Sequence, residues 1–116
     1  MKMIVAIVQP FWLTNVVAAL EAIEGFPGMS ISGTRGFGHG KSFEGAYPYG
    51  LKLEDYVNYS EMLRFEIVAR DEMVDDIVEV IERTVRTGSR RNGMIYVLPV
   101  EGAIRLQTGK VNDGAI

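Results

Sequence analysis

The order of sequence patterns along the chain is the feature that most restricts its fold. Strand, helix and strand patterns occur in that order twice, and an aperiodic segment separates the two sets. The expected elements are strands over Lys2–Gln9, Met29–Arg35, Met62–Arg70 and Met94–Val100, a helix over Leu13–Glu24, and a helix that Asp71 caps and Thr87-Gly88 ends. Right-handed connections fold such a series into a four-stranded antiparallel sheet with both helices on one face. The sequence therefore predicts an α+β fold of the ferredoxin-like βαββαβ type, with a long loop between the second and third strands.

The patterns inside these elements indicate which sides are buried. Met3–Val8 is apolar at every position, which is typical of a strand covered on both faces. Thr14 and Asp71 are the expected N-caps of the two helices. Alternation predicts that the second and third strands are half-buried, with these residues on their apolar sides: Met29, Ile31, Gly33, Leu63, Phe65, Ile67 and Ala69.

The predicted fold leaves one face of the sheet open, and a chain of 116 residues has little left to cover it. Because the first strand is apolar on both faces, we expect self-association to cover the open face.

Length and composition exclude several classes of protein. At 116 residues, the chain is expected to form one domain over residues 1–116. It contains no cysteine, which excludes a disulfide framework and a thiolate metal site. Its formal net charge of −3 argues against nucleic acid as the main partner, because phosphate binding needs a basic face. No apolar run approaches the roughly 18 residues that span a bilayer, and the apolar start is too short for a signal peptide, so we expect a cytoplasmic protein that is not embedded in a membrane.

The segment Thr34–Tyr59 fits neither a helix nor a strand pattern well. It begins with three glycines at alternate positions, Gly36, Gly38 and Gly40, and we expect a long loop over about residues 38–61. Loops of this length inside compact domains usually carry function. Four of the five tyrosines lie in this segment, and they are the expected partner-binding residues: Tyr47, Tyr49, Tyr56 and Tyr59. The sequence thus predicts a rigid platform that displays one loop.

Five segments in a fixed order cover nearly the whole chain. They are M-K-M-I-V-A-I-V-Q-P-F-W-L, G-M-S-I-S, G-F-G-H-G-K, R-T-V-R-T-G-S-R-R-N-G-M-I-Y-V and A-I-R-L-Q-T-G. In order and spacing they resemble the PII signal-transduction proteins. The resemblance implies a homotrimer of ferredoxin-like subunits that binds adenine nucleotides in clefts between subunits. It also implies that the long loop engages a target, such as a membrane transporter or a metabolic enzyme, according to nucleotide and 2-oxoglutarate.

The resemblance assigns nucleotide-binding roles position by position. Ile7 forms a wall of the cleft, Gly28 to Ser30 lie on the adenine and ribose side, and Val68 lies near the base, while Glu66 matches the same strand. The complete expected set is Ile7, Gly28, Met29, Ser30, Gly36, Phe37, Gly38, His39, Val68, Thr87, Gly88, Arg90, Arg91, Asn92, Gly93 and Arg105. A short loop over about 88–92 and a C-terminal tail over about 101–116 complete the expected organisation. The nucleotide is expected as an effector, with no cofactor and no metal site.

The chain departs from the family pattern at positions that matter for charge. His39 stands where the family has Arg, Met94 where it has a phosphate-binding Lys, and Gln107 where it has a second tail Arg. Gly40 replaces a Gln that helps to hold magnesium and 2-oxoglutarate, and Arg91-Asn92 replaces Gly-Asp. Because a triphosphate needs several cations or amide donors, we predict a preference for AMP or ADP over MgATP and no sensing of 2-oxoglutarate.

Simpler interpretations stay open for several residues. His39 is either a solvated loop residue or a phosphate contact, and the loop glycines serve either a turn or a close approach to phosphate. The loop tyrosines either pack on a neighbouring subunit or partner, or are modified. Met73 and Met94 are expected to fill core space. A group of arginines either contacts phosphate or complements the end of a helix: Arg83, Arg86, Arg90 and Arg91.

Three functions compete at this point. A nucleotide-sensing regulator needs no catalytic residue, and the sequence offers no nucleophile–base set, since it has no cysteine, one histidine and no serine in a nucleophile elbow. A small hydrolase of phosphate esters or acyl phosphates is the second function, because acylphosphatases share this fold class and Arg91-Asn92 is a candidate pair, although the spacing does not match. The third is a metal-tolerance trimer of the related CutA type, against which the intact G-F-G and R-T-G positions speak. We expect the regulator, and no enzyme.

Overall fold

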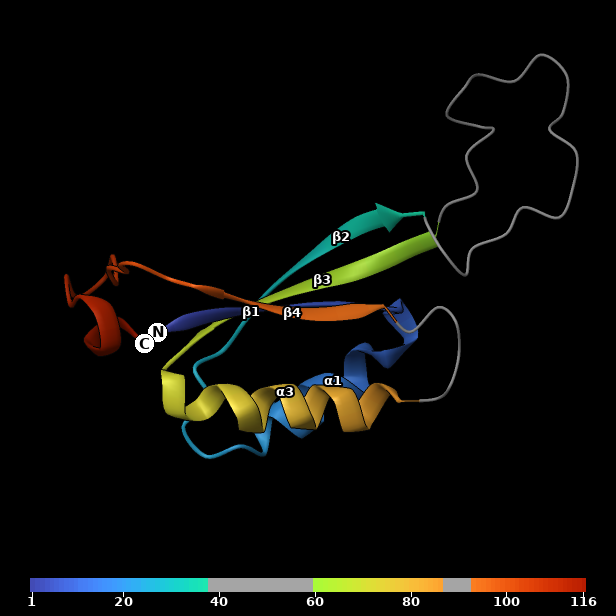
Figure 1. Ribbon diagram of the computed structural model, residues 1–116, viewed down its shortest axis with the longest axis horizontal. Coiled ribbons are helices and arrows are strands. Elements are labelled where there is room, and N and C mark those ends of the chain that lie inside the picture. Colours follow the sequence, from blue (N-terminus) through green and yellow to red (C-terminus); the bar gives the residue numbers. More distant parts are fainter. Residues whose placement is uncertain (38–59, 87–92) are drawn as a thin grey trace, which may run out of the picture.

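The computed structural model of the protein describes residues 1–37, 60–86 and 93–116. Its elements are, in order, β1 (Lys2–Val8), the 3-10 helix η1 (Pro10–Trp12), α1 (Leu13–Glu21), β2 (Ser30–Gly36), β3 (Ser60–Ala69), α3 (Asp71–Val85), β4 (Met94–Pro99) and the 3-10 helix η2 (Asn112–Ala115). The strands form one antiparallel sheet in the order β2-β3-β1-β4, and both helices lie on one face of it (Figure 1). The predicted α+β, ferredoxin-like fold is confirmed.

The two helices begin differently from the prediction. Thr14 does not cap the first helix, because the chain enters α1 directly from η1 and Trp12 occupies the N-cap position without a side-chain hydrogen bond. Asp71 does not cap α3, because Arg70 takes that position and Asp71 is the first helical residue. The Asp71 carboxylate instead accepts a hydrogen bond from the α-amino group of Met1 at 2.5 Å. It lies at the end of the helix where the dipole favours negative charge.

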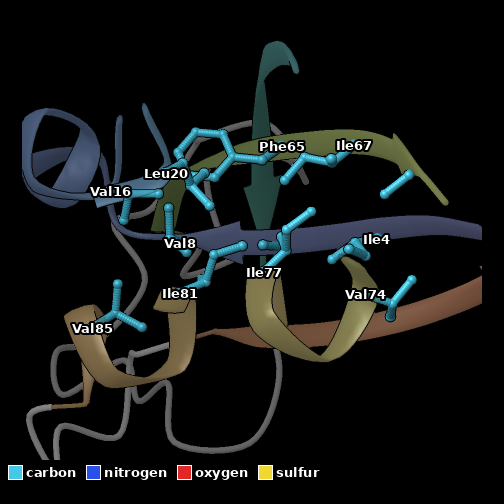
Figure 2. Packing of buried hydrophobic residues seen from close by; sticks show 12 residues of the cluster. Ile4, Val8, Val16, Leu20, Phe65, Ile67, Val74, Ile77, Ile81 and Val85 are labelled. Atoms are coloured by element: carbon cyan, nitrogen blue, oxygen red, sulfur yellow. The ribbon is translucent and has the colours of Figure 1, made fainter. Parts of the chain in front are cut away.

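The core lies between the sheet and the two helices, as Figure 2 shows. The predicted apolar side of β3 is confirmed, and Phe65 is among the largest fully buried side chains. Met73 packs against the same cluster, as expected from the sequence, and Trp12 also packs against it. The buried cluster consists of Ile4, Ala6, Val8, Val16, Leu20, Phe65, Ile67, Ala69, Val74, Ile77, Ile81 and Val85.

The opposite face of the sheet is open in the described part of the chain. Directly opposed residues of an antiparallel pair point to the same side, so this side carries Met3, Val5 and Ile7 of β1 with Leu98, Tyr96 and Met94 of β4. Val5 is fully buried there, although it is not part of the cluster beneath the helices. Met94 is 64% exposed and Leu98 is 38% exposed. The expectation that Met94 fills core space was wrong, because its side chain belongs to the open side.

β2 and β3 continue beyond the rest of the sheet. Val8, the last residue of β1, pairs with Leu63 of β3, and Leu63 in turn pairs with Gly33 of β2. Three further pairs follow, which we name the stalk: Thr34 with Met62, Arg35 with Glu61, and Gly36 with Ser60. At about 3.4 Å per residue, the stalk carries its last pair about 10 Å beyond the row of Val8. Ser60 and Glu61, which the sequence placed in the long loop, therefore belong to β3.

As an edge strand, β2 is less buried than its alternation predicted. Ile31 is 46% exposed, although it lies opposite the buried Phe65 and so faces the same side of the sheet. An edge strand has a neighbour on one side only, which leaves its outer flank open to solvent.

The C-terminal tail, for which the sequence predicted no element, forms a small hairpin followed by η2. The amide of Arg105 donates to the carbonyl of Lys110 at 2.8 Å, and Ile104 and Val111 form an isolated bridge. Arg70 Nη2 donates to the carbonyl of Asp113 at 3.1 Å, which ties the tail to the start of α3. Figure 1 shows the tail at the end of the sheet where β1 begins, opposite to the end where β2 stops.

Candidate functional site

A cavity at the tail end of the sheet brings together several residues that the resemblance assigns to the nucleotide. It has a volume of about 670 Å³ and is named here the tail-side cavity. The assigned residues that line it are Gly28, Met29, Ser30, Val68 and Arg105. Its lining also includes Glu66 of β3 and Gln107, Ala115 and Ile116 of the tail. Segments from three distant parts of the sequence therefore form its walls.

Strand pairing and backbone conformation explain how β2 and β3 build their wall. Glu66 and Val68 are two residues apart on β3 and so point to the same side of the sheet. Ser30 lies directly opposite Glu66. Gly28 has a φ of +94°, a conformation that favours glycine, but no atom lies within 4 Å of the position that a Cβ would occupy. Gly28 is therefore required for conformation and not for space.

Arg105 is held in this cavity by the tail itself. Its Nε donates to the carbonyl of Ala115 at 2.8 Å, and its own carbonyl accepts from the amide of Gly109 at 2.7 Å. A guanidinium has five N–H donors, so this arrangement fixes the group and leaves other donors for an anion. Among the described residues, no other lysine or arginine lines this cavity.

A second cavity, of about 400 Å³, lies at the opposite end of β1 and is named here the loop-side cavity. Ile7, Gly93 and Met94 line it, together with Val85 and Arg86 near the end of α3. Gly93 has a φ of +90°, and a Cβ on it would stand 1.7 Å from the carbonyl oxygen of Ile7. Only glycine fits there, because any side chain would collide with the backbone of β1.

The remaining assigned residues lie at the stalk or outside the described residues. Gly36 ends the stalk, and Phe37 follows it with 76% of its surface exposed. Placement is not described for the assigned residues Gly38, His39, Thr87, Gly88, Arg90, Arg91 and Asn92, or for the loop tyrosines Tyr47, Tyr49, Tyr56 and Tyr59.

Arg83 of α3 and Arg86, the residue at its C-cap, take part in ion pairs with glutamates of that helix. Arg83 Nη1 lies 3.6 Å from Glu79 Oε1, and Arg86 pairs with Glu82. Pairs at this spacing support a helix locally. For these two residues the geometry favours the interpretation in which they stabilise the end of the helix.

A polar group on the open side of the sheet adjoins the tail-side cavity. Arg64 Nε donates to Glu66 Oε1 at 2.9 Å, and Arg64 Nη1 donates to Tyr96 Oη at 3.3 Å. The hydrogen bond to Glu66 is the main cause that raises the pKa of the Arg64 guanidinium, while partial desolvation opposes it. Sequence reasoning missed Arg64 and Tyr96, because their strands β3 and β4 are not neighbours and β1 lies between them. Their proximity depends on the strand order and not on spacing along the chain.

The two cavities occupy separate positions on one chain. Ile7 is level with Arg64 and Met94, whereas Met3 is level with Val68. Four residues separate these rows along β1, or about 13 Å. The cavities share no lining residue. The residues assigned to one ligand are thus divided between two ends of the sheet.

Comparison with known proteins identifies a matching family and several similar proteins. The model of the family described as "Nitrogen regulatory protein P-II" matches residues 1–110. The chain belongs to this family. Proteins named nitrogen regulatory protein P-II from Haemophilus influenzae and Pasteurella multocida are 40% and 39% identical to it, and nitrogen regulatory protein P-II 1 from Escherichia coli K12 is 38% identical. Each comparison covers 116 residues and the full length of both chains.

Membership of the P-II family confirms the resemblance seen in the sequence and gives a regulatory role as the general function. In the described ranges, no group of three or more His, Cys, Asp or Glu side chains is placed to hold a metal ion. None of the helices in those ranges is long and apolar enough to cross a membrane.

Proposed function

We propose that the protein is a P-II-type regulator that associates as a homotrimer and binds an adenine nucleotide, as an effector, in clefts between subunits. The observation that carries this proposal is the division of the assigned residues between the tail-side and loop-side cavities. One chain offers five members of the set at one end of its sheet and two, Ile7 and Gly93, at the other. In a closed ring, the tail-side cavity of one subunit faces the loop-side cavity of the next, and each cleft then contains both halves.

The uncovered surfaces of the single chain support self-association. The open side of the sheet exposes Met94 and Leu98, and the tail exposes Ile104, Leu106 and Val111, with Leu106 at 96%. Exposed apolar surface of this kind marks an interaction site. A second and third copy of the chain supply the simplest cover.

The regulatory output follows from the family resemblance. We infer that the long loop and its tyrosines contact a target, which is a membrane transporter or a metabolic enzyme in the cytoplasm. The protein carries out no chemical reaction in this proposal, and nucleotide occupancy changes the loop's contact with the target.

The charges of the site favour a short phosphate chain. Arg105 is the cation of the tail-side cavity, while Gln107 and Met94 stand where the family has further cations. Each missing charge-assisted bond is worth roughly 1.5–3 kcal/mol, so two losses weaken triphosphate binding about a hundred-fold or more. Calorimetry with AMP, ADP and MgATP measures this. MgATP binding tightest of the three would contradict the predicted order.

A mixed-subunit experiment tests the inter-subunit cleft directly. Arg105→Ala damages the tail-side half and Ile7→Glu damages the loop-side half, so each variant alone is expected to lose nucleotide binding. Both variants are then refolded together in equal amounts. A cleft is intact only if its tail-side half comes from an Ile7→Glu subunit and its loop-side half from an Arg105→Ala subunit. Random assembly of a ring therefore restores about a quarter of the clefts.

Size-exclusion chromatography with light scattering first establishes that each variant still forms the same oligomer as the unmodified chain. Restored binding then supports shared clefts. If the mixture binds no more nucleotide than the two variants separately, both halves act within one chain and the proposal fails.

A further inference from the structure

Three hydrogen-bonded side chains cross the open side of the sheet at the edge of the tail-side cavity. Glu66 and Arg64 lie on β3, Tyr96 lies on β4, and β1 runs between the two strands. Arg64 donates to Glu66 Oε1 at 2.9 Å and to Tyr96 Oη at 3.3 Å. The Arg64 and Glu66 side chains are 34% and 42% exposed in the single chain, so they lie outside its core. We refer to them as the Tyr96–Arg64–Glu66 series.

Glu66 carries the one acidic side chain among the described residues that line the tail-side cavity. An ionised carboxylate only accepts hydrogen bonds, and it has a second oxygen besides the Oε1 that Arg64 engages. The groups of an adenine nucleotide that donate hydrogen bonds are the ribose hydroxyls and the exocyclic amine of the base. A carboxylate at this position is therefore suited to one of these donors and unsuited to phosphate.

Position along β3 distinguishes the two kinds of donor. Val68 is assigned to the base, and Glu66 is two residues away on the same side of the strand, or about 6–7 Å. That separation is comparable with the distance from a purine ring to the hydroxyls of its ribose. Ser30, assigned to the adenine and ribose side, lies directly opposite Glu66.

We propose that Arg64 and Tyr96 are positioning residues that hold the Glu66 carboxylate against the ribose hydroxyls, and that the three together set a preference for ribonucleotides over 2′-deoxyribonucleotides. The inference rests on the nucleotide-binding function proposed above. Among the described residues, Arg64 is the one side chain that bonds to the Glu66 carboxylate and so fixes its rotamer. Tyr96 accepts from Nη1 of the guanidinium while Glu66 accepts from Nε. The planar fork of Arg64 thus directs donors from two separate nitrogens to its two partners, whereas a lysine has all its donors on one nitrogen.

The test compares affinities for ADP and 2′-deoxy-ADP by calorimetry in the full-length chain. We expect the unmodified protein to prefer ADP by about ten-fold, the value of one hydrogen bond to a charged group. Glu66→Gln is expected to remove most of this ratio. Tyr96→Phe and Arg64→Lys are expected to lower it about two- to three-fold, although neither residue touches the ligand. Arg83→Lys, the same change on the exposed side of α3, serves as the control and leaves the ratio unchanged.

The ratio separates positioning from a general structural role. A structural defect weakens both ligands equally, so an unchanged ratio in Tyr96→Phe and Arg64→Lys would overturn the inference while the nucleotide site itself stands. Glu66→Gln could instead change the ratio of the affinities for ADP and IDP while the ratio for ADP and 2′-deoxy-ADP stays constant. That result would assign Glu66 to the base and would also overturn the inference. Failure of ADP to bind the unmodified protein would defeat the proposed function and this inference together. Tyr96→Phe removes a single oxygen, so it keeps the test decisive if Glu66→Gln fails to fold.

Discussion

Replacing Gly93 by alanine tests the packing that joins the loop-side cavity to the sheet. The backbone of Gly93 lies so close to β1 that an added Cβ would stand 1.7 Å from the oxygen and 2.8 Å from the carbon of the Ile7 carbonyl. A Cβ essentially never approaches other atoms within 3.0 Å. The start of β4 therefore has to move away from Ile7, at the place where Ile7 pairs with Met94.

Two costs add at this position. A non-glycine residue at a φ of +90° costs about 1–2 kcal/mol. Moving β4 off β1 sacrifices about one backbone hydrogen bond at the end of the ladder, which is worth about 1–3 kcal/mol. We expect Gly93→Ala to lower the free energy of unfolding by about 2–5 kcal/mol in total.

Gly28→Ala is the matched control. Gly28 has a φ of +94° but no atom within 4 Å of its Cβ position, so it carries the first cost and not the second. The difference between the two variants isolates the collision and is expected to be about 2 kcal/mol, or about 8 °C in Tm. Thermal unfolding at one fixed protein concentration measures it, because association makes Tm depend on concentration. Equal Tm values for the two variants would refute the reasoning.

Three further predictions concern the core, the start of α3 and the phosphate end of the site. Phe65→Ala is expected to cost about 3–5 kcal/mol in urea unfolding, because the ring is fully buried; a cost below about 1 kcal/mol would contradict the described core. Asp71→Asn is expected to lower Tm at pH 7. The hydrogen bond from the Met1 amino group lowers the pKa of Asp71, so this stabilisation is present above the ordinary aspartate pKa of about 3.9 and is lost as pH falls through the lower folded value. The Tm values of the two proteins should converge in strong acid, and a gap that persists there argues against the pair. Met94→Lys adds a cation at a 64% exposed position beside the loop-side cavity and is expected to raise the affinity for ATP relative to AMP about ten-fold; equal changes for both nucleotides would count against a phosphate near Met94.

Strong periodicity made most of the fold predictable from the sequence. The stripe from Val74 to Val85 on α3 reflects burial of one side of a helix, which repeats with the helical period. The continuous apolar run of β1 reflects apolar side chains on both faces of a central strand. The caps were predicted wrongly, because Thr14 and Asp71 suit an N-cap chemically but the preceding turn decides where the helix starts. The tail hairpin is held by backbone bonds and by Arg70, which leave no hydropathy pattern.

The candidate site was predictable only in part, because some of its contacts join residues that are far apart in the sequence. The resemblance supplied Gly28, Ser30 and Arg105, which the structure gathers around one cavity. The contact of Gly93 with Ile7 and the bond between Arg64 and Tyr96 depend on which strands are neighbours. Spacing along the chain carries no information on such neighbours. They become visible only once the strand order is known.

The stalk determines how far the segment between Gly36 and Ser60 starts from the body of the subunit. Its height is a count of strand pairs, so it changes in fixed increments of about 3.4 Å. Removing one pair would also turn every outer side chain to the opposite side, whereas removing two pairs restores their orientation and lowers the tip by about 7 Å. Designed variants can thus change the height of the stalk in steps of two residues per strand, while the sheet below keeps its register.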